Sequence, residues 1–166
     1  MESKGWDEAG MTDADQVRLA TVILGASVLT QDFEGLRLKP YKDTVGKTSI
    51  GFGRNLDDRG ITLGEALQLL HNDLIRCYGE CDASIPGFKD LARARQVVLV
   101  DMCYNMGIRG LMNFKMMIAD VVAGDYEAAA GEMLSSKWAG QVRRRAVKLA
   151  RIMKSGDLSA GDLVVA

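Results

Sequence analysis

Residues 33–56, FEGLRLKPYKDTVGKTSIGFGRNL, decide the fold of this chain. Glu34 closes a helical pattern, and Asp43 follows it in a polar segment. From residue 41 to residue 52, glycines and β-branched residues replace the helical spacing of apolar residues. Such residues are poor helix formers and favour strands and tight turns, so the stretch predicts a small antiparallel sheet. Residues 55–60 are expected to form a polar turn after it.

The segments around this stretch carry helix signals. Thr12 and Asp15 resemble a capping box ahead of apolar residues at helical spacing, which predicts a helix up to Gly35. The sequence does not decide whether this helix is interrupted near Gly25. Thr62 and Glu65 predict the start of the next helix. Further helices are expected over 92–106, 111–122, 125–134 and 143–154, with a short segment around Trp138. The prediction is therefore an α+β protein that is mostly helical.

Length and composition bound the domain organisation. With 166 residues, of which 48% are hydrophobic, the chain can bury the core of one domain. We expect a flexible arm at 1–11, one domain at 12–156 and a tail at 157–166. Within the domain we expect a small sheet-containing lobe at about 34–62, a connecting helix at about 62–80 and a helical lobe at about 88–156.

Charge and hydropathy exclude several classes of function. A net charge of −1 argues against a protein that binds nucleic acid by bulk charge. The longest apolar run, at 19–29, is too short to cross a bilayer and contains polar and glycine residues. The segment before it is acidic and lacks the basic region of a signal peptide. No signal peptide, transmembrane segment or stable membrane insertion is therefore expected, and we expect a monomer.

The cysteines predict neither a disulfide framework nor a metal centre. Cys77, Cys81 and Cys103 make an odd count, and helix geometry disfavours a bridge between the first two. His71 is the single histidine, so cysteine and histidine alone form no ordinary zinc set. We expect reduced, partly buried thiols, no metal and no cofactor.

Glu34 and Asp43 are candidate acid and base. Phe33 and Leu36 flank Glu34, and apolar surroundings would favour its protonated form. Asp43 lies in a polar segment that would keep it ionised. Opposed environments of this kind give one site an acid and a base at the same pH. Spacing alone leaves open that both carboxylates are merely solvated or ion-paired.

Several motifs in order resemble one family. EGLRLKPYKDTVG and TSIGFGRNL are followed by NMG at 105–107, Gly110, Phe114, DYEAAA from Asp125, SKW at 136–138 and RRA at 144–146. Together they closely resemble the phage-type lysozymes, the tailed-bacteriophage endolysin family of muramidases, over about residues 26–156. The resemblance implies a lysozyme-like, two-lobed fold, with the small sheet in the first lobe, a long connecting helix and a C-terminal helical lobe.

The resemblance also implies a reaction, namely hydrolysis of the β-1,4 bond between N-acetylmuramic acid and N-acetylglucosamine in peptidoglycan. Glu34 matches the general acid, and Asp43 and Ser49 match the residues that position the attacking water. Relatives usually carry threonine at the position of Ser49; serine keeps the hydroxyl but loses the methyl group. An inverting outcome is expected, with carboxyl groups about 6.5–9.5 Å apart.

Supporting residues follow from the same resemblance. Arg54 stands where many relatives carry a histidine, and we expect it to pair with Asp73. Arg145 matches an arginine that approaches the catalytic glutamate in relatives. The matched groove residues are Tyr104, Asn105 and Trp138, although core packing of Tyr104 is equally open. Met117 and Glu132 occupy two further groove positions and suit a sugar less obviously.

Two other functions remain open at this point. One is a catalytically weak or non-catalytic relative that binds cell walls, and the other is a lytic transglycosylase that uses Glu34 alone. The expected partner is the peptidoglycan glycan strand, with a holin or virion components as further candidates. The expected location is the host bacterial cytoplasm before release to the cell wall, or the virion.

Overall fold

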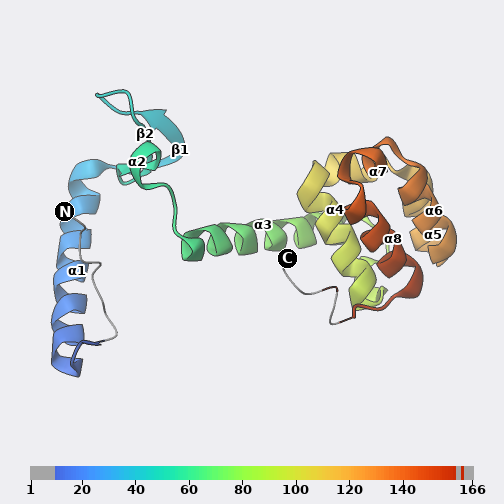
Figure 1. The fold of residues 1–166 in the computed structure, drawn as a ribbon, viewed down its shortest axis with the longest axis horizontal. Helices are drawn as coiled ribbons and strands as arrows, with labels where there is room; N and C mark the ends of the chain where they lie inside the picture. The colour runs from blue at the N-terminus through green and yellow to red at the C-terminus, as the bar shows by residue number, and fades with distance from the viewer. Residues whose placement is uncertain (1–9, 160–161, 163–166) are drawn as a thin grey trace. The chain divides into compact units, whose positions relative to one another are not determined.

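The computed structural model describes residues 10–159 and residue 162 (Figure 1). The chain divides into two compact units, Met1–Leu63 and Gly64–Ala166, and each is described by itself. Most of the arm predicted at 1–11 and much of the tail predicted at 157–166 lie outside the described residues. No helix in the described part of the chain is long and apolar enough to cross a membrane.

The first unit begins with helix α1 (Asp13–Glu34). Its N-terminus is the capping box that the sequence predicts. The Asp15 amide donates a hydrogen bond to Thr12 Oγ1, and the Thr12 amide donates one to Asp15 Oδ2, both at 3.3 Å. The helix runs through Gly25 without a break and ends at Gly35, whose φ of 67° suits glycine. Its last residue, Glu34, is thereby placed beside the sheet that follows.

The predicted sheet is present and has three antiparallel strands in the order β1-β2-β3. They are β1 (Arg37–Lys42), β2 (Thr48–Gly51) and β3 (Arg54–Asn55). Ser49 on the central strand pairs with Tyr41 on one side and Asn55 on the other. Pro40 lies in edge strand β1, where a missing amide donor is tolerated.

A short helix, α2 (Leu56–Arg59), replaces the polar turn expected at 55–60. Asn55 caps it, because its Oδ1 accepts from the Asp58 amide at 2.9 Å. The Thr48 amide donates to Asp57 Oδ2 at 2.8 Å, which ties α2 to β2. This hydrogen bond lowers the pKa of the Asp57 carboxyl.

The second unit is helical and contains almost all of α3. Its helices pack mainly through α8, which contacts both α4 and α6; the group is seen at the yellow-to-red end of the chain in Figure 1. The elements are α3 (Leu63–Ser84), η2 (Phe88–Asp90), α4 (Arg93–Met112), α5 (Lys115–Ala123), α6 (Tyr126–Ser135), α7 (Lys137–Val142) and α8 (Arg144–Ser155).

Helix α4, predicted over 92–106, contributes several residues to the core of this unit. Val98, Leu99 and Met102 are fully buried within the cluster that fills this unit. The sequence predicts that this helix ends before Gly107. Instead, the helix kinks at Gly107 and continues to Met112. Gly107 has φ 73° and ψ 161°, a backbone conformation that residues with a Cβ rarely adopt, so the glycine produces the kink.

Candidate active site

Glu34 is held at the junction of α1 and the sheet. A Cβ built at Gly53, in the turn between β2 and β3, would lie 3.1 Å from Glu34 Oε2. Gly53 also has a φ of 78°, so glycine suits this position both for its backbone and for the room that it leaves. Within this unit the turn and the carboxylate are therefore close neighbours.

The environment of Glu34 differs from the apolar one that its neighbours in sequence predict. Glu34 is exposed, α1 buries none of its residues, and the Phe33 side chain is 82% exposed. Phe33 lies in the last turn of α1 and Leu36 lies between Gly35 and β1, and both side chains are exposed. Adjacent sequence indicates which residues are apolar but not whether another element covers them.

Asp43 is fixed by the turn between β1 and β2. Its Oδ1 accepts hydrogen bonds from the amides of Val45 at 3.0 Å and Lys47 at 2.8 Å. The Asp43 amide donates to the Lys47 carbonyl at 2.9 Å, which closes the turn. An aspartate that accepts hydrogen bonds from the amides of its own turn is held in one orientation. Asp43 therefore has a structural role in addition to any catalytic one.

Ser49 and Thr48 are distinct candidates for the hydroxyl that the resemblance implies. Ser49 is 2% exposed and is the only buried polar residue in the part of the chain that the structure describes. The Thr48 hydroxyl already has a hydrogen-bond partner, since its Oγ1 accepts from Lys42 Nζ at 2.8 Å. Successive residues of a strand face opposite sides of the sheet, so the two hydroxyls cannot replace one another.

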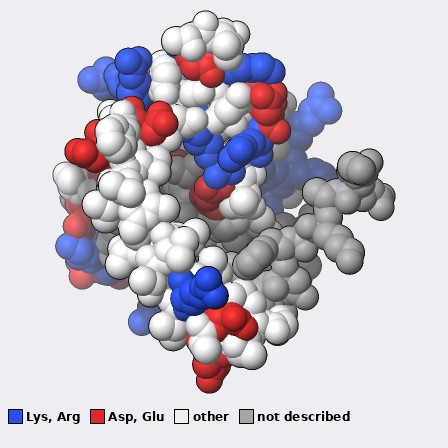
Figure 2. Space-filling view, turned by 90° about the vertical axis from the view of Figure 1, so that its left-hand side faces the viewer, with Lys and Arg blue, Asp and Glu red and all other residues white. Residues whose placement is uncertain are grey.

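Charges of both signs surround these residues. Lys47 Nζ lies 2.7 Å from Asp58 Oδ1, and Lys42 Nζ lies 3.8 Å from Asp57 Oδ2. On the face drawn in Figure 2, basic and acidic side chains are interspersed with uncharged surface. These exposed pairs join β1 and the turn after it to α2, and they contribute little to stability.

The supporting residues Arg54 and Asp73 belong to different units. Arg54 Nε donates to the Gly60 carbonyl at 2.9 Å inside the first unit. Asp73 Oδ1 lies 3.4 Å from Arg76 Nη2 inside the second. The Arg54–Asp73 ion pair stays a prediction.

Arg145 has a partner that the sequence did not predict. Its Nε donates to Asp101 Oδ1 at 2.8 Å, and its Nη2 donates to the Asp101 carbonyl at 3.4 Å. The contact joins α8 to α4 and fixes the guanidinium. No local pattern could reveal it, because the two residues lie far apart in the sequence. The approach of Arg145 to Glu34 stays a prediction.

The structure brings together two of the three predicted groove residues. Trp138 Nε1 donates to Asn105 Oδ1 at 2.8 Å, which joins α7 to α4. The Trp138 ring is 7% exposed and packs edge-on against Phe114, with centroids 6.1 Å apart. Tyr104 is 43% exposed on α4 and is not part of the core. Trp138 therefore packs against the core and orients the Asn105 amide, and part of it also lines a pocket.

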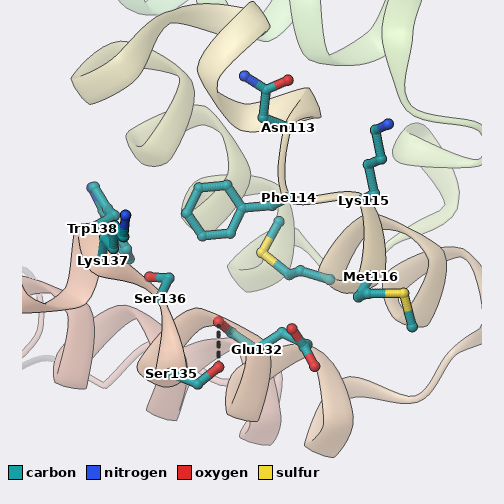
Figure 3. A pocket seen from close by; sticks show the side chains of 10 residues that line it. Asn113, Phe114, Lys115, Met116, Glu132, Ser135, Ser136, Lys137 and Trp138 are labelled. Carbon is teal, nitrogen blue, oxygen red and sulfur yellow. Dashed lines mark hydrogen bonds between the residues drawn. The ribbon is translucent and has the colours of Figure 1, made fainter.

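A pocket of about 580 Å³ opens beside Trp138. Phe114 and Trp138 lie on one side of it, and Glu132 and Ser135 lie on the other (Figure 3). Met117 and Glu132, the two matched groove positions that suit a sugar less obviously, both line it. An aromatic wall facing polar groups is suited to a ring that has apolar faces and polar edges.

Comparison with known proteins gives consistent results. The family model described as phage lysozyme matches residues 31–148. The chain is 29% identical over 163 residues to the pre-baseplate central spike protein Gp5 of Enterobacteria phage T4, covering 81% of this chain but 28% of that protein. It is 26% identical to the probable T4-type lysozyme 1 of Dictyostelium discoideum, over 76% of this chain and 92% of that protein. It is 25% identical to the SAR-endolysin of Bacteriophage PS119, over 80% and 83% respectively.

Proposed function

The chain belongs to the phage lysozyme family, and from that premise we propose that it hydrolyses the β-1,4 bond between N-acetylmuramic acid and N-acetylglucosamine in peptidoglycan. The observation that carries the proposal is the pair of carboxylates on one small unit. Glu34 lies against the Gly53 turn, and Asp43 is oriented by two backbone amides. Both stand where the family's motif has its acid and its water-positioning aspartate.

In the proposed reaction, Glu34 donates its proton to the glycosidic oxygen as the bond to the anomeric carbon breaks. A water molecule attacks that carbon from the opposite face. Asp43 accepts a hydrogen bond from this water and then its proton, and the Ser49 hydroxyl helps to orient it. This geometry leads to inversion at the anomeric carbon and needs room for the water between carboxylate and sugar.

The glycan strand is the proposed partner, with Tyr104, Asn105 and Trp138 as its contacts. Asn105 is suited to an acetamido group, because its amide can both donate and accept and Trp138 fixes its orientation. Arg54, Asp73 and Arg145 are proposed to support the site. No step of this reaction calls on a cofactor.

The relatives include both a baseplate spike protein and an endolysin. We therefore propose a phage context in which the chain either is carried by the virion or acts from the host cytoplasm on the cell wall. Mass spectrometry of purified virions separates the two. Peptides of this chain in the particle support the virion, and their absence supports release from the host.

Glu34→Gln tests the enzyme most simply. The amide keeps the size of the side chain but cannot donate a proton as an acid, and loss of a general acid costs about 10²–10⁴-fold in rate. We expect purified cell walls to be cleared by the wild type and not by this variant.

Glu127→Gln is the matched control. Its carboxylate is exposed on α6 and pairs with Lys154, so it should clear walls like the wild type. Clearing by Glu34→Gln at the wild-type rate would contradict the proposal. Binding of walls by the wild type without clearing would instead indicate a non-catalytic relative.

A further inference from the structure

The three cysteines gather in the core of the second unit. Cys77 and Cys81 lie on one face of α3, and Cys103 faces them from α4. All three are free and buried, with at most 1% of any residue exposed. Buried cysteines commonly act as small apolar residues. These are different, because a carboxylate is directed at them.

Glu80 reaches this cluster from the turn of α3 that follows Cys77. Cys103 Sγ donates to Glu80 Oε2 at 3.4 Å. One ligand atom from each of Cys77, Glu80 and Cys103 lies within 4.8 Å of the other two. Around a tetrahedral zinc ion, with bonds of about 2.0–2.3 Å, ligand atoms are about 3.4–3.8 Å apart. The three atoms thus need only small side-chain movements to bind one ion.

Arg76 orients the Glu80 carboxylate toward the thiols. Its Nη1 donates to Glu80 Oε1 at 2.9 Å, so one oxygen is engaged by the guanidinium and the other faces the thiols. Hydrogen bonds of this kind orient metal ligands and balance their charge. Two thiolates, one carboxylate, one divalent cation and the guanidinium sum to zero charge. A buried site of this composition would be neutral.

We propose that Cys77, Cys103 and Glu80 bind one zinc ion that joins α3 to α4. The ion is a thiophilic divalent cation, because thiolates select zinc over magnesium or calcium. On binding, each thiol loses its proton to solvent, and no redox step is involved. Water completes the tetrahedron from the side of Glu80, whose side chain is 32% exposed. The site uses none of the residues proposed for glycan hydrolysis.

The spacing of cysteines and histidines in the sequence does not reveal this site, because one of its ligands is the Glu80 carboxylate. With His71 as the single histidine, no ordinary set could be formed. Only the packing of α3 on α4 adds Glu80 and brings Cys103 to Cys77. Cys81 is excluded from the set, since its Sγ is directed at the Leu99 carbonyl at 3.6 Å.

Cadmium and zinc titrations of the reduced, metal-free full chain test the proposal. Cadmium should produce a thiolate-to-metal ultraviolet band that saturates at one ion per chain. Zinc should abolish that band by competition and raise the melting temperature. X-ray absorption of the zinc form should show two sulfur ligands at about 2.3 Å with lighter atoms completing the shell.

Substitutions of the cysteines and of Glu80 identify which residues bind the ion. Cys77→Ala and Cys103→Ala should lose the band, whereas Cys81→Ala, the matched control, should keep it. Glu80→Gln alters a partly exposed side chain and keeps both thiols, so it should fold and bind zinc about tenfold or more weakly. Absence of the band in the wild type, or its persistence in Cys103→Ala, would overturn the proposal. So would equal zinc affinity in Glu80→Gln and the wild type.

Discussion

At the scale of single residues, the position of Glu34 depends on a glycine. Gly53 combines a φ of 78° with a Cβ direction that points at the Glu34 carboxylate. Gly124, at the end of α5, has a similar φ of 80°, but a Cβ there would meet nothing within 4 Å. The two glycines therefore share the backbone requirement and differ only in their neighbour. Alanine substitutions at the two glycines therefore distinguish the effect of crowding the Glu34 carboxylate from the effect of backbone strain.

Gly53→Ala should lower both stability and activity. The methyl group must displace the Glu34 carboxylate, and a misplaced catalytic group costs about tenfold or more in rate. Gly124→Ala should cost a similar amount of stability, about 1 kcal/mol, because both positions strain an alanine. Its rate should stay near that of the wild type. Equal losses of rate in the two variants, measured by wall clearing alongside thermal melts, would contradict a specific contact at Glu34.

The residues of the acid pair could be chosen from the sequence, but their surroundings could not. Asp43 carries a local signal, since an aspartate ahead of a glycine turn often accepts from its own backbone. Glu34 carries no such signal, and its apolar neighbours suggested a burial that its own unit does not provide. Burial depends on which elements pack together, and that information is not local.

At the scale of secondary structure, the hydrogen bond between Trp138 and Asn105 links α7 to α4 just before the kink at Gly107. Trp138→Phe keeps an aromatic ring against Phe114 but removes the indole N–H and leaves space in the core. We expect a loss of about 1–3 kcal/mol in the free energy of unfolding, measured by denaturant titration.

Tyr104→Phe provides the comparison for this prediction. It changes one oxygen on a neighbouring side chain that is 43% exposed, so the free energy of unfolding should change by about 0.5 kcal/mol or less. If Trp138→Phe were as mild as Tyr104→Phe, the hydrogen bond and the packing would not hold these helices together.

Helices with caps and strong apolar spacing could be predicted, and short elements could not. The starts of α1 and α6 follow from the side chains of Thr12 and Asp125, each of which accepts from a backbone amide. The sequence of α2 predicts a turn instead of a helix, because four residues are too few to show a helical period. The contact of Arg145 with Asp101 required the packing of α8 on α4, for which the sequence has no local pattern.

At the scale of the whole molecule, each unit has a carboxyl group whose pKa is lowered on folding. In the first unit, the Thr48 amide lowers the pKa of Asp57. In the second, the Arg151 guanidinium and then Ser159 lower the pKa of Asp162. A carboxyl with a lowered folded-state pKa adds stability above its unfolded pKa of about 3.9. That contribution is lost as the pH falls toward the folded-state pKa.

Thermal melts between pH 2 and pH 7 should therefore show a fall in melting temperature that begins near pH 4. Asp162→Asn should melt below the wild type at pH 7, and the difference should shrink as the pH is lowered. Asp32→Asn, which alters an exposed residue on α1, serves as the control and should track the wild type. If the melting temperatures of Asp162→Asn and the wild type differed by the same amount at every pH down to 2, a lowered pKa of Asp162 would not explain the difference.

Digestion of purified peptidoglycan in heavy-oxygen water tests whether the chain hydrolyses the glycan with Glu34 and Asp43. Mass spectrometry of the soluble fragments should find one heavy oxygen at a reducing N-acetylmuramic acid end, and Glu34→Gln should release no such fragments. Fragments with anhydro-muramic ends and no heavy oxygen, or the same labelled fragments from Glu34→Gln, would contradict the account.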